Sequence, residues 1–157
     1  MPRTYKDDAR WDGVEFVSVD VGARNKSDKL MYEGYQYCTR GERQLAELLT
    51  VQGIAFTPDV PFWLPKPDGR SRLFVPDFIF DRKPFLWHAR RRPMMIHGIE
   101  AKGKTRNGNF SDRALENVRL LREHRGIVVL LLSNSQIKQY FNKGRLPLKP
   151  LDPMSDE

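Results

Sequence analysis

A run of six apolar side chains, Ile127 to Leu132 (IVVLLL), sets the fold class of this 157-residue chain. The run is too short to cross a membrane as a helix, which takes about 20 residues. It shows no alternation of polar and apolar residues, which is typical of a strand that is buried on both faces. Such a strand lies inside a sheet that helices cover, so the run predicts an α/β fold.

Helical and strand patterns surround this run. Thr39 and Glu42 have the spacing of a capping box, and the apolar residues Leu45, Leu48 and Leu49 follow it, which predicts a helix from residue 39 to about 52. We further expect strands over 54–64, 73–80 and 94–102, a helix from 111 or 112 to 123, the apolar strand over 126–133 and a short helix over 135–142. The order α-β-β-β-α-β, plus a short C-terminal helix, predicts a central mixed β-sheet flanked by helices.

These elements divide the chain into three segments. Residues 39–143 form the expected core domain, which follows an N-terminal arm over 1–38. In the arm, Val14 to Val21 is an expected strand, and Tyr32, Tyr35 and Tyr37 are expected to dock the arm on the domain or on a second subunit. Residues 144–157 are rich in proline and then acidic, so we expect a flexible tail.

Several classes of protein are excluded by composition. The single cysteine, Cys38, rules out an internal disulfide framework, and with only three histidines it cannot complete a zinc-finger ligand set. The N-terminal residues lack the apolar stretch of a secretory signal. We therefore expect a cytoplasmic protein without a membrane partner.

The net charge of +7 is concentrated in one segment, residues 82–106, which holds eight basic residues and one acid. This balance suits a polyanionic partner such as the phosphate backbone of nucleic acid; a merely solvated face is the alternative. Phe85 and Trp87 lie beside the arginines and add candidate stacking contacts. The candidate DNA-binding residues are Arg82, Lys83, Arg90, Arg91, Arg92, Lys104 and Arg106.

Two carboxylates and a lysine form a candidate catalytic cluster in the same region. Glu100 and Lys102 project from one face of their strand, roughly 7 Å apart at about 3.4 Å per residue. If the strand of Asp77 is a neighbour of this strand, Asp77 lies beside Glu100. Nearby carboxylates repel each other unless a cation lies between them, and their hard oxygen ligands suit Mg²⁺. An exposed ion pair between Glu100 and Lys102 is the simpler alternative.

The sequence resembles the PD-(D/E)XK nuclease superfamily, which has the restriction-endonuclease-like fold. Pro76-Asp77, 22 intervening residues and Glu100-Ala101-Lys102 match its motif, and the order of elements over 40–133 matches its core. The layout is most similar to the phage endonuclease I type of junction resolvases, with a glutamate-led helix at Gly41-Glu42 and a Gly-Ile-x-Phe strand at Gly53 to Phe56. The longer connection between Asp77 and Glu100 departs from those resolvases, as does the N-terminal arm.

The resemblance implies a metal-dependent DNA endonuclease that hydrolyses phosphodiester bonds, with Mg²⁺ as the cofactor and Mn²⁺ as a substitute. Its substrate would be a specific duplex site, as for homing or transposon-end nucleases, or a branched junction. Asp77, Glu100, Ala101 and Glu42 would be the metal-binding residues, and Lys102 the catalytic lysine. The capping box explains Glu42 equally well without catalysis. We expect at least a homodimer, because one such site cuts one strand. The alternative is a non-catalytic nucleic-acid-binding domain that keeps the nuclease fold.

Overall fold

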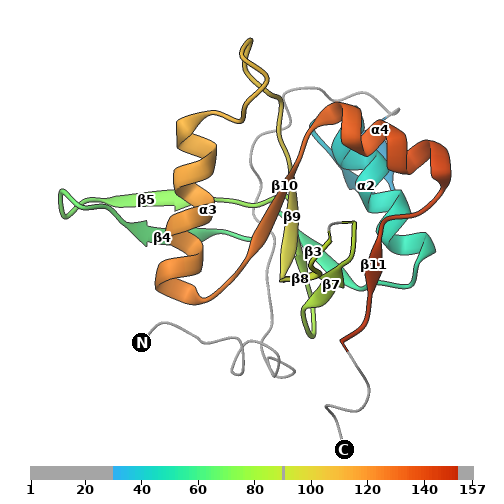
Figure 1. Cartoon of the computed structure of the whole chain (residues 1–157), viewed down its shortest axis with the longest axis horizontal. Helices are drawn as coiled ribbons and strands as arrows, with labels where there is room; N and C mark the ends of the chain where they lie inside the picture. The colour runs from blue at the N-terminus through green and yellow to red at the C-terminus, as the bar shows by residue number, and fades with distance from the viewer. Residues whose placement is uncertain (1–29, 90, 152–157) are drawn as a thin grey trace, which may run out of the picture.

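The structure is a computed structural model that describes residues 30–89 and 91–151. Short strands and three helices make up this part of the chain (Figure 1). In chain order they are β1 (Met31–Tyr32), β2 (Tyr35–Gln36), α2 (Arg40–Val51), β3 (Phe56–Pro58), β4 (Phe62–Pro65), β5 (Ser71–Phe74), β6 (Phe78–Phe80), β7 (Phe85–Trp87), β8 (Met94–Ile96), β9 (Gly98–Ala101), α3 (Asp112–Arg125), β10 (Val129–Leu132), α4 (Asn134–Lys143) and β11 (Leu148–Lys149). No helix among these residues is long and apolar enough to span a membrane.

A four-stranded mixed sheet forms the centre, in the order β10-β9-β6-β3. β10 and β9 are parallel, whereas β6 is antiparallel to both β9 and β3. The apolar run forms β10, as predicted, and Val129, Leu130 and Leu132 are buried. β9 packs tightly on β6 because Gly98 has no side chain: a Cβ there would lie 2.2 Å from the carbonyl oxygen of Phe78. The architecture is therefore mixed α/β.

Helices cover both faces of the sheet (Figure 1). α2 and α4 pack on one face, where Leu45 and Ile137 join Phe78 in a single buried cluster. α3 and the β4–β5 hairpin pack on the other face, where Leu121 joins Ile79. Because successive strand residues point to opposite faces, β6 supplies Phe78 to one cluster and Ile79 to the other.

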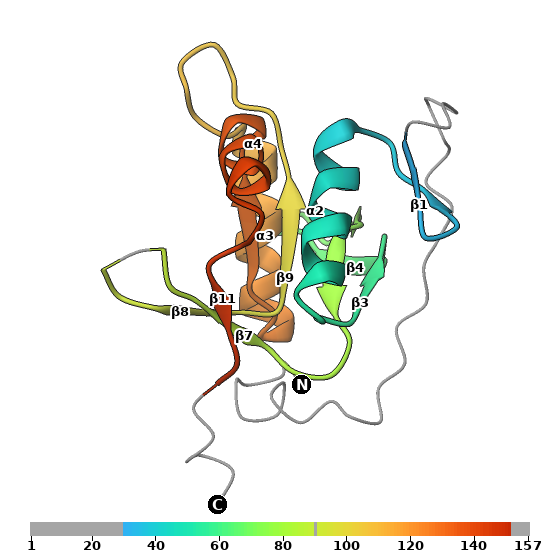
Figure 2. The same cartoon turned by 90° about the vertical axis from the view of Figure 1, so that its right-hand side faces the viewer.

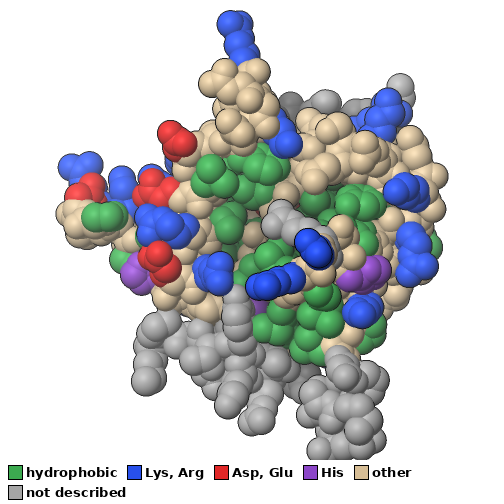
Figure 3. All heavy atoms as spheres, viewed as in Figure 1, with side chains coloured by type: hydrophobic (Ala, Val, Ile, Leu, Met, Phe, Trp, Pro, Cys, Tyr) green, Lys and Arg blue, Asp and Glu red, His purple; other side chains and the backbone are tan. Residues whose placement is uncertain are grey.

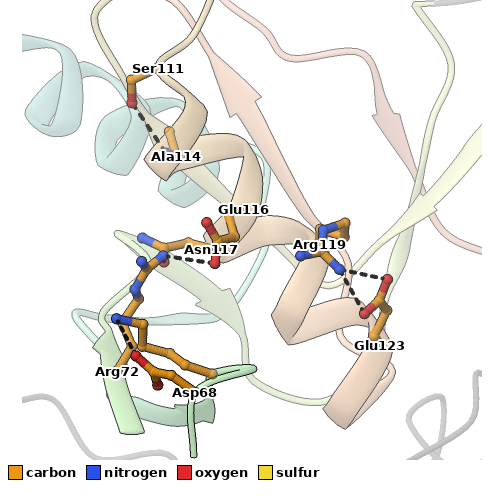
Figure 4. A network of polar contacts seen from close by, with 9 residues as sticks. Asp68, Arg72, Ser111, Ala114, Glu116, Asn117, Arg119 and Glu123 are labelled. Atoms are coloured by element: carbon orange, nitrogen blue, oxygen red, sulfur yellow. Dashed lines mark hydrogen bonds and ion pairs between the residues drawn. The ribbon is translucent and has the colours of Figure 1, made fainter. Parts of the chain in front are cut away.

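Arg72 of β5 attaches the β4–β5 hairpin to α3 (Figure 4). Its guanidinium donates a hydrogen bond to the Asn117 side chain at 3.0 Å and lies 3.6 Å from the Glu116 carboxylate. The start of α3 is fixed by Ser111, whose hydroxyl accepts the Ala114 N–H at 3.2 Å. This N-cap confirms the predicted start of the helix.

Each of the three longer strands expected before α3 is divided into two short strands. The segment over 54–64 breaks at Asp59, whose φ of 52° lies in the left-handed region and turns the chain from β3 into β4. The segment over 73–80 breaks before Pro76-Asp77, between β5 and β6. The segment over 94–102 breaks at His97, where the chain passes from one sheet to another. Alternation of side chains alone does not reveal these changes of sheet.

The segment over 81–93, which joins the expected strands over 73–80 and 94–102, is itself partly a strand. It contains β7, which pairs with β8 as an antiparallel hairpin. β11 pairs with the other edge of β7, and Leu146 and Leu148 are buried. The expected flexible tail over 144–157 is therefore wrong for its first part, because two buried leucines and a strand pairing fix it to the domain.

The described part of the N-terminal arm packs against the domain. β1 and β2 form a hairpin whose turn, Glu33 and Gly34, has φ values of 50° and 79°, as a two-residue hairpin turn requires. Tyr37 is buried in the core, with its ring 4.9 Å from that of Tyr35 and 5.9 Å from that of Phe78. The tyrosines thus dock the arm on its own domain. The expected strand over 14–21 lies outside the described residues.

Candidate metal centre

Three neighbouring strands of the central sheet each place a carboxylate at or next to the same end of the sheet. Phe78 of β6 is paired with Pro58 of β3 on one side and Ile99 of β9 on the other. One residue further along, Asp77 therefore lies between Asp59 and Glu100. The Asp59 N–H donates to the Asp77 carbonyl at 3.0 Å, and the Ala101 N–H donates to the Asp77 carboxylate at 2.7 Å. The sheet itself thus assembles a row of three acids.

The first turn of α2 adds a fourth carboxylate, that of Glu42. The Thr39 hydroxyl accepts the Glu42 N–H at 3.2 Å and lies 2.9 Å from the Glu42 carboxylate, to which it donates. The helix cap therefore holds this side chain in place. One oxygen each of Glu42, Asp59 and Asp77 lie within 4.8 Å of one another, so these three residues form a group that could hold a metal ion.

Burial raises the pKa of every acid in this group, and repulsion between the carboxylates raises that of Asp77 and Glu42 further. The pKa of Asp77 lies well above its usual value because its carboxyl is desolvated, and the charges of Glu42 and Glu100 raise it further. Desolvation likewise raises the pKa of Glu42 and that of Asp59. A cation bound among these oxygens would favour the charged form of each acid.

The charge of Lys102 acts on the pKa of Glu100. Desolvation raises its pKa from 4.5 to about 7, while the ammonium of Lys102 acts in the opposite direction. Lys102 follows the last residue of β9 and is exposed to solvent. Its charge is therefore available beside the carboxylates without being buried.

The structure brings together the residues that the sequence singled out. Asp77 directly precedes β6 and Glu100 lies on the neighbouring strand β9, so the two are side by side as predicted, with Glu42 and Lys102 beside them. Ala101 contributes its N–H to the Asp77 carboxylate. Sequence reasoning missed Asp59. Its signal was the dipeptide Pro58-Asp59 at the end of β3, which repeats Pro76-Asp77 at the start of β6.

Asp59 is held by Tyr35 of the β1–β2 hairpin, whose hydroxyl donates a hydrogen bond to the Asp59 carboxylate. We expect Tyr35→Phe to weaken divalent-ion binding by about 10- to 100-fold, because a partner that orients a metal ligand typically contributes that much. Calorimetric titration measures the change. Tyr140→Phe is the matched control, because the Tyr140 ring packs on Trp87 instead. Equal affinities for the two variants would contradict a role for the Tyr35 hydroxyl at the metal centre.

The candidate DNA-binding residues divide into two groups. Lys104 and Arg106 are exposed on the loop between β9 and α3, which leaves the sheet at the end where the carboxylates lie. A basic side chain projects from the tip of this loop (Figure 3). Arg82 and Lys83 follow β6 at its opposite end, and Arg91 and Arg92 lie on the β7–β8 hairpin, which projects from that end of the sheet (Figure 2). Arg90 lies outside the described residues.

Two parts of the sequence interpretation of this segment are therefore wrong. The arginine hairpin is not next to the carboxylates, because β7 and β8 form a separate sheet with β11. Trp87 is not free for stacking on bases, because its ring is buried against Tyr140 with centroids 5.4 Å apart. The Phe85 ring is half-buried and packs on Phe80 at 5.3 Å.

Comparison with models of known protein families, with characterised proteins and with solved structures gives no match. The functional argument therefore depends on the geometry of the site itself.

Proposed function

We propose that the chain is a Mg²⁺-dependent DNA endonuclease with a restriction-endonuclease-like core. The observation that carries this proposal is the row of Asp59, Asp77 and Glu100 across three adjacent strands, with Lys102 two residues beyond Glu100. A surface ion pair would not need three further buried or half-buried carboxylates around it.

The donor set fits a hard divalent cation. All candidate ligands are carboxylate oxygens, which Mg²⁺ prefers, and Mn²⁺ accepts the same set. Burial, and to a smaller extent the charges of neighbouring acids, raise the pKa values of Asp77 and Glu42, and a bound cation would offset both effects. When bound, Mg²⁺ would polarise the phosphodiester and lower the pKa of a ligated water.

The side chains around the site have three separate roles: metal binding, orientation of a ligand and stabilisation of charge. Asp77, Glu42 and Asp59 form the tight oxygen group that would hold the ion, and Glu100 completes the row next to Asp77. The Ala101 N–H fixes the orientation of the Asp77 carboxylate. The exposed ammonium of Lys102 is placed to stabilise negative charge that develops on the phosphoryl group, or to take a proton from the attacking water.

DNA is the proposed partner, and basic residues at both ends of the sheet support it. The substrate is a specific duplex site or a branched junction. Because one such centre cuts one strand, cutting two strands is most simply done by a symmetric homodimer.

Replacing Arg90, Arg91 and Arg92 together with alanine is expected to flatten the salt dependence of DNA binding. Each lost phosphate contact on duplex DNA reduces the slope of log affinity against log salt by about 0.9. Fluorescence anisotropy at a series of salt concentrations measures the slope. Arg122 and Arg125, which are exposed at the end of α3, provide the matched control. An unchanged slope in the triple variant would mean that the hairpin is only a solvated face.

Cleavage assays test the proposed function directly. The protein is incubated with labelled closed-circular plasmid, a four-way junction and duplexes from its own genomic neighbourhood, with either Mg²⁺ or EDTA. We expect strand breaks in at least one substrate with Mg²⁺ and none with EDTA. Tight binding without breaks in either Mg²⁺ or Mn²⁺ would favour the non-catalytic nucleic-acid-binding domain instead.

A further inference from the structure

A cavity of about 660 Å³ opens beside the metal centre, between the start of α2, the end of β9 and α4. Two of its lining residues contact the carboxylates. The Ala101 N–H holds Asp77, and the Thr39 hydroxyl holds Glu42. The cavity is therefore a neighbour of the acids, although no acidic residue lines it.

The charge of the cavity is opposite to that of the metal centre. Arg40 of α2 and Lys138 of α4 both line it, and both are exposed to solvent. No ion pair joins either of them to another residue in the described part of the chain. Two cations without carboxylate partners at the rim of a cavity suit an anionic group such as a phosphate.

The remaining wall suits a nucleobase. Gln44, Asn134 and Asn142 contribute amide side chains, which both donate and accept hydrogen bonds, as the polar edges of bases do. The half-buried ring of Phe141 offers an aromatic surface. Base stacking on an aromatic ring does not depend on sequence, because every base has a flat face.

We propose that this cavity receives one unpaired nucleotide of the DNA strand that the metal centre cuts; this inference rests on the proposed function. The volume is that of a small-ligand site, which suits one nucleotide. A base that is paired and stacked in a duplex offers neither its Watson–Crick edge to the amides nor its face to Phe141. The substrate strand would therefore be unpaired next to the scissile phosphate, as at a branch, a strand end or a flipped base.

Binding without metal tests the cavity separately from cleavage. Anisotropy in EDTA is measured with a labelled oligothymidylate and with a blunt duplex of the same length, and thymidine 5′-monophosphate serves as a competitor. The test variants are Arg40→Ala/Lys138→Ala and Phe141→Leu, which keeps the apolar volume but removes the ring. The matched control is Lys143→Ala/Arg145→Ala, because both residues are exposed in or just after α4 and neither lines the cavity.

We expect the Arg40/Lys138 variant to bind the single strand about tenfold more weakly and the blunt duplex less than about threefold more weakly. Phe141→Leu is expected to cost about fivefold on the single strand, and the control variant less than about twofold. Unchanged single-strand affinity in the Arg40/Lys138 variant, or an equal loss on the duplex, would overturn the proposal. So would a monophosphate that competes as well as the oligonucleotide, since the cavity would then be a site for free nucleotides. If the single strand binds as expected but no DNA is cut with Mg²⁺, the cavity stands and the nuclease function fails.

Discussion

Lys102→Met is expected to slow DNA cleavage by about 10²- to 10³-fold, which is the typical cost of losing one well-placed transition-state charge. Lys102 is exposed directly after β9, and its ammonium opposes the rise in the pKa of Glu100 that desolvation causes, so it acts on the acids without being part of the core. Methionine keeps an unbranched side chain and removes the ammonium group with its charge and donors. Rates under single-turnover conditions measure the effect.

DNA affinity is expected to stay within a few-fold of wild type in this variant, because one lysine supplies little of the total phosphate attraction. Lys104→Met is the matched control: Lys104 is exposed on the same loop, with its ammonium 5.4 Å from the centroid of the Phe110 ring. If both variants cut as fast as wild type, Lys102 is a solvated lysine and the catalytic assignment is wrong.

Asp77→Ala should stop cleavage by a different route. The carboxylate at the centre of the row is lost, so the ion is held less tightly and excess Mg²⁺ should restore part of the activity. DNA binding without metal should not weaken, because alanine removes a carboxyl group that repels phosphates wherever it is charged. Measuring cleavage and affinity over a range of Mg²⁺ concentrations separates this behaviour from that of Lys102→Met, which excess metal should not rescue.

The metal-free protein is expected to lose stability as the pH rises from about 5 to about 7.5. Desolvation raises the pKa of Glu100 from 4.5 to about 7, so the folded state binds a proton that the unfolded state has already released over this range. Stability therefore falls with rising pH, because the free energy of unfolding decreases wherever the folded state binds more protons. For Glu100 alone the loss over this range is roughly 2 kcal/mol. The raised pKa values of Asp77 and Glu42 act in the same direction.

Urea unfolding at the two pH values, in EDTA, measures this loss for wild type and for Glu100→Gln. Glutamine mimics the protonated acid, so the variant is expected to match wild type near pH 5 and to be the more stable protein near pH 7.5. Mg²⁺ should remove most of the difference, since an ion that binds only the folded state stabilises it. Equal pH dependence of the two proteins would show that the Glu100 carboxyl is not desolvated as the structure has it.

The residue pattern predicted the sheet and most of the acidic row. Asp77 and Glu100 could be placed together because their strands are neighbours and each carboxylate lies near the end of its strand. Asp59 could not be placed with them from the sequence. The backbone turns into the left-handed region at this residue and ends β3, and the alternation of apolar residues does not encode such a local conformation. Over 54–64 the prolines indicated an irregular strand, but not the point at which it changes sheets.

The position of the β7–β8 hairpin relative to the carboxylates likewise could not be predicted from the residue pattern. Closeness in sequence placed Arg91 and Arg92 near Glu100, but β8 and β9 belong to different sheets, and the chain passes between them at His97. The partner of β7 on its other edge, β11, lies some sixty residues further along the chain. Such a pairing is decided by tertiary packing, here the burial of Trp87 and Leu148.

Calorimetric titration of Mn²⁺ into the protein at neutral pH tests the central claim most directly, namely that the carboxylate row holds a divalent ion. Wild type is compared with Asp77→Asn, which removes the central charge, and with Asp68→Asn, which removes an exposed carboxylate in the turn between β4 and β5. We predict that wild type and Asp68→Asn bind the ion with equal affinity and that Asp77→Asn binds it at least about tenfold more weakly. Absence of binding to wild type, or equal binding to all three proteins, would contradict the metal centre and with it the proposed nuclease.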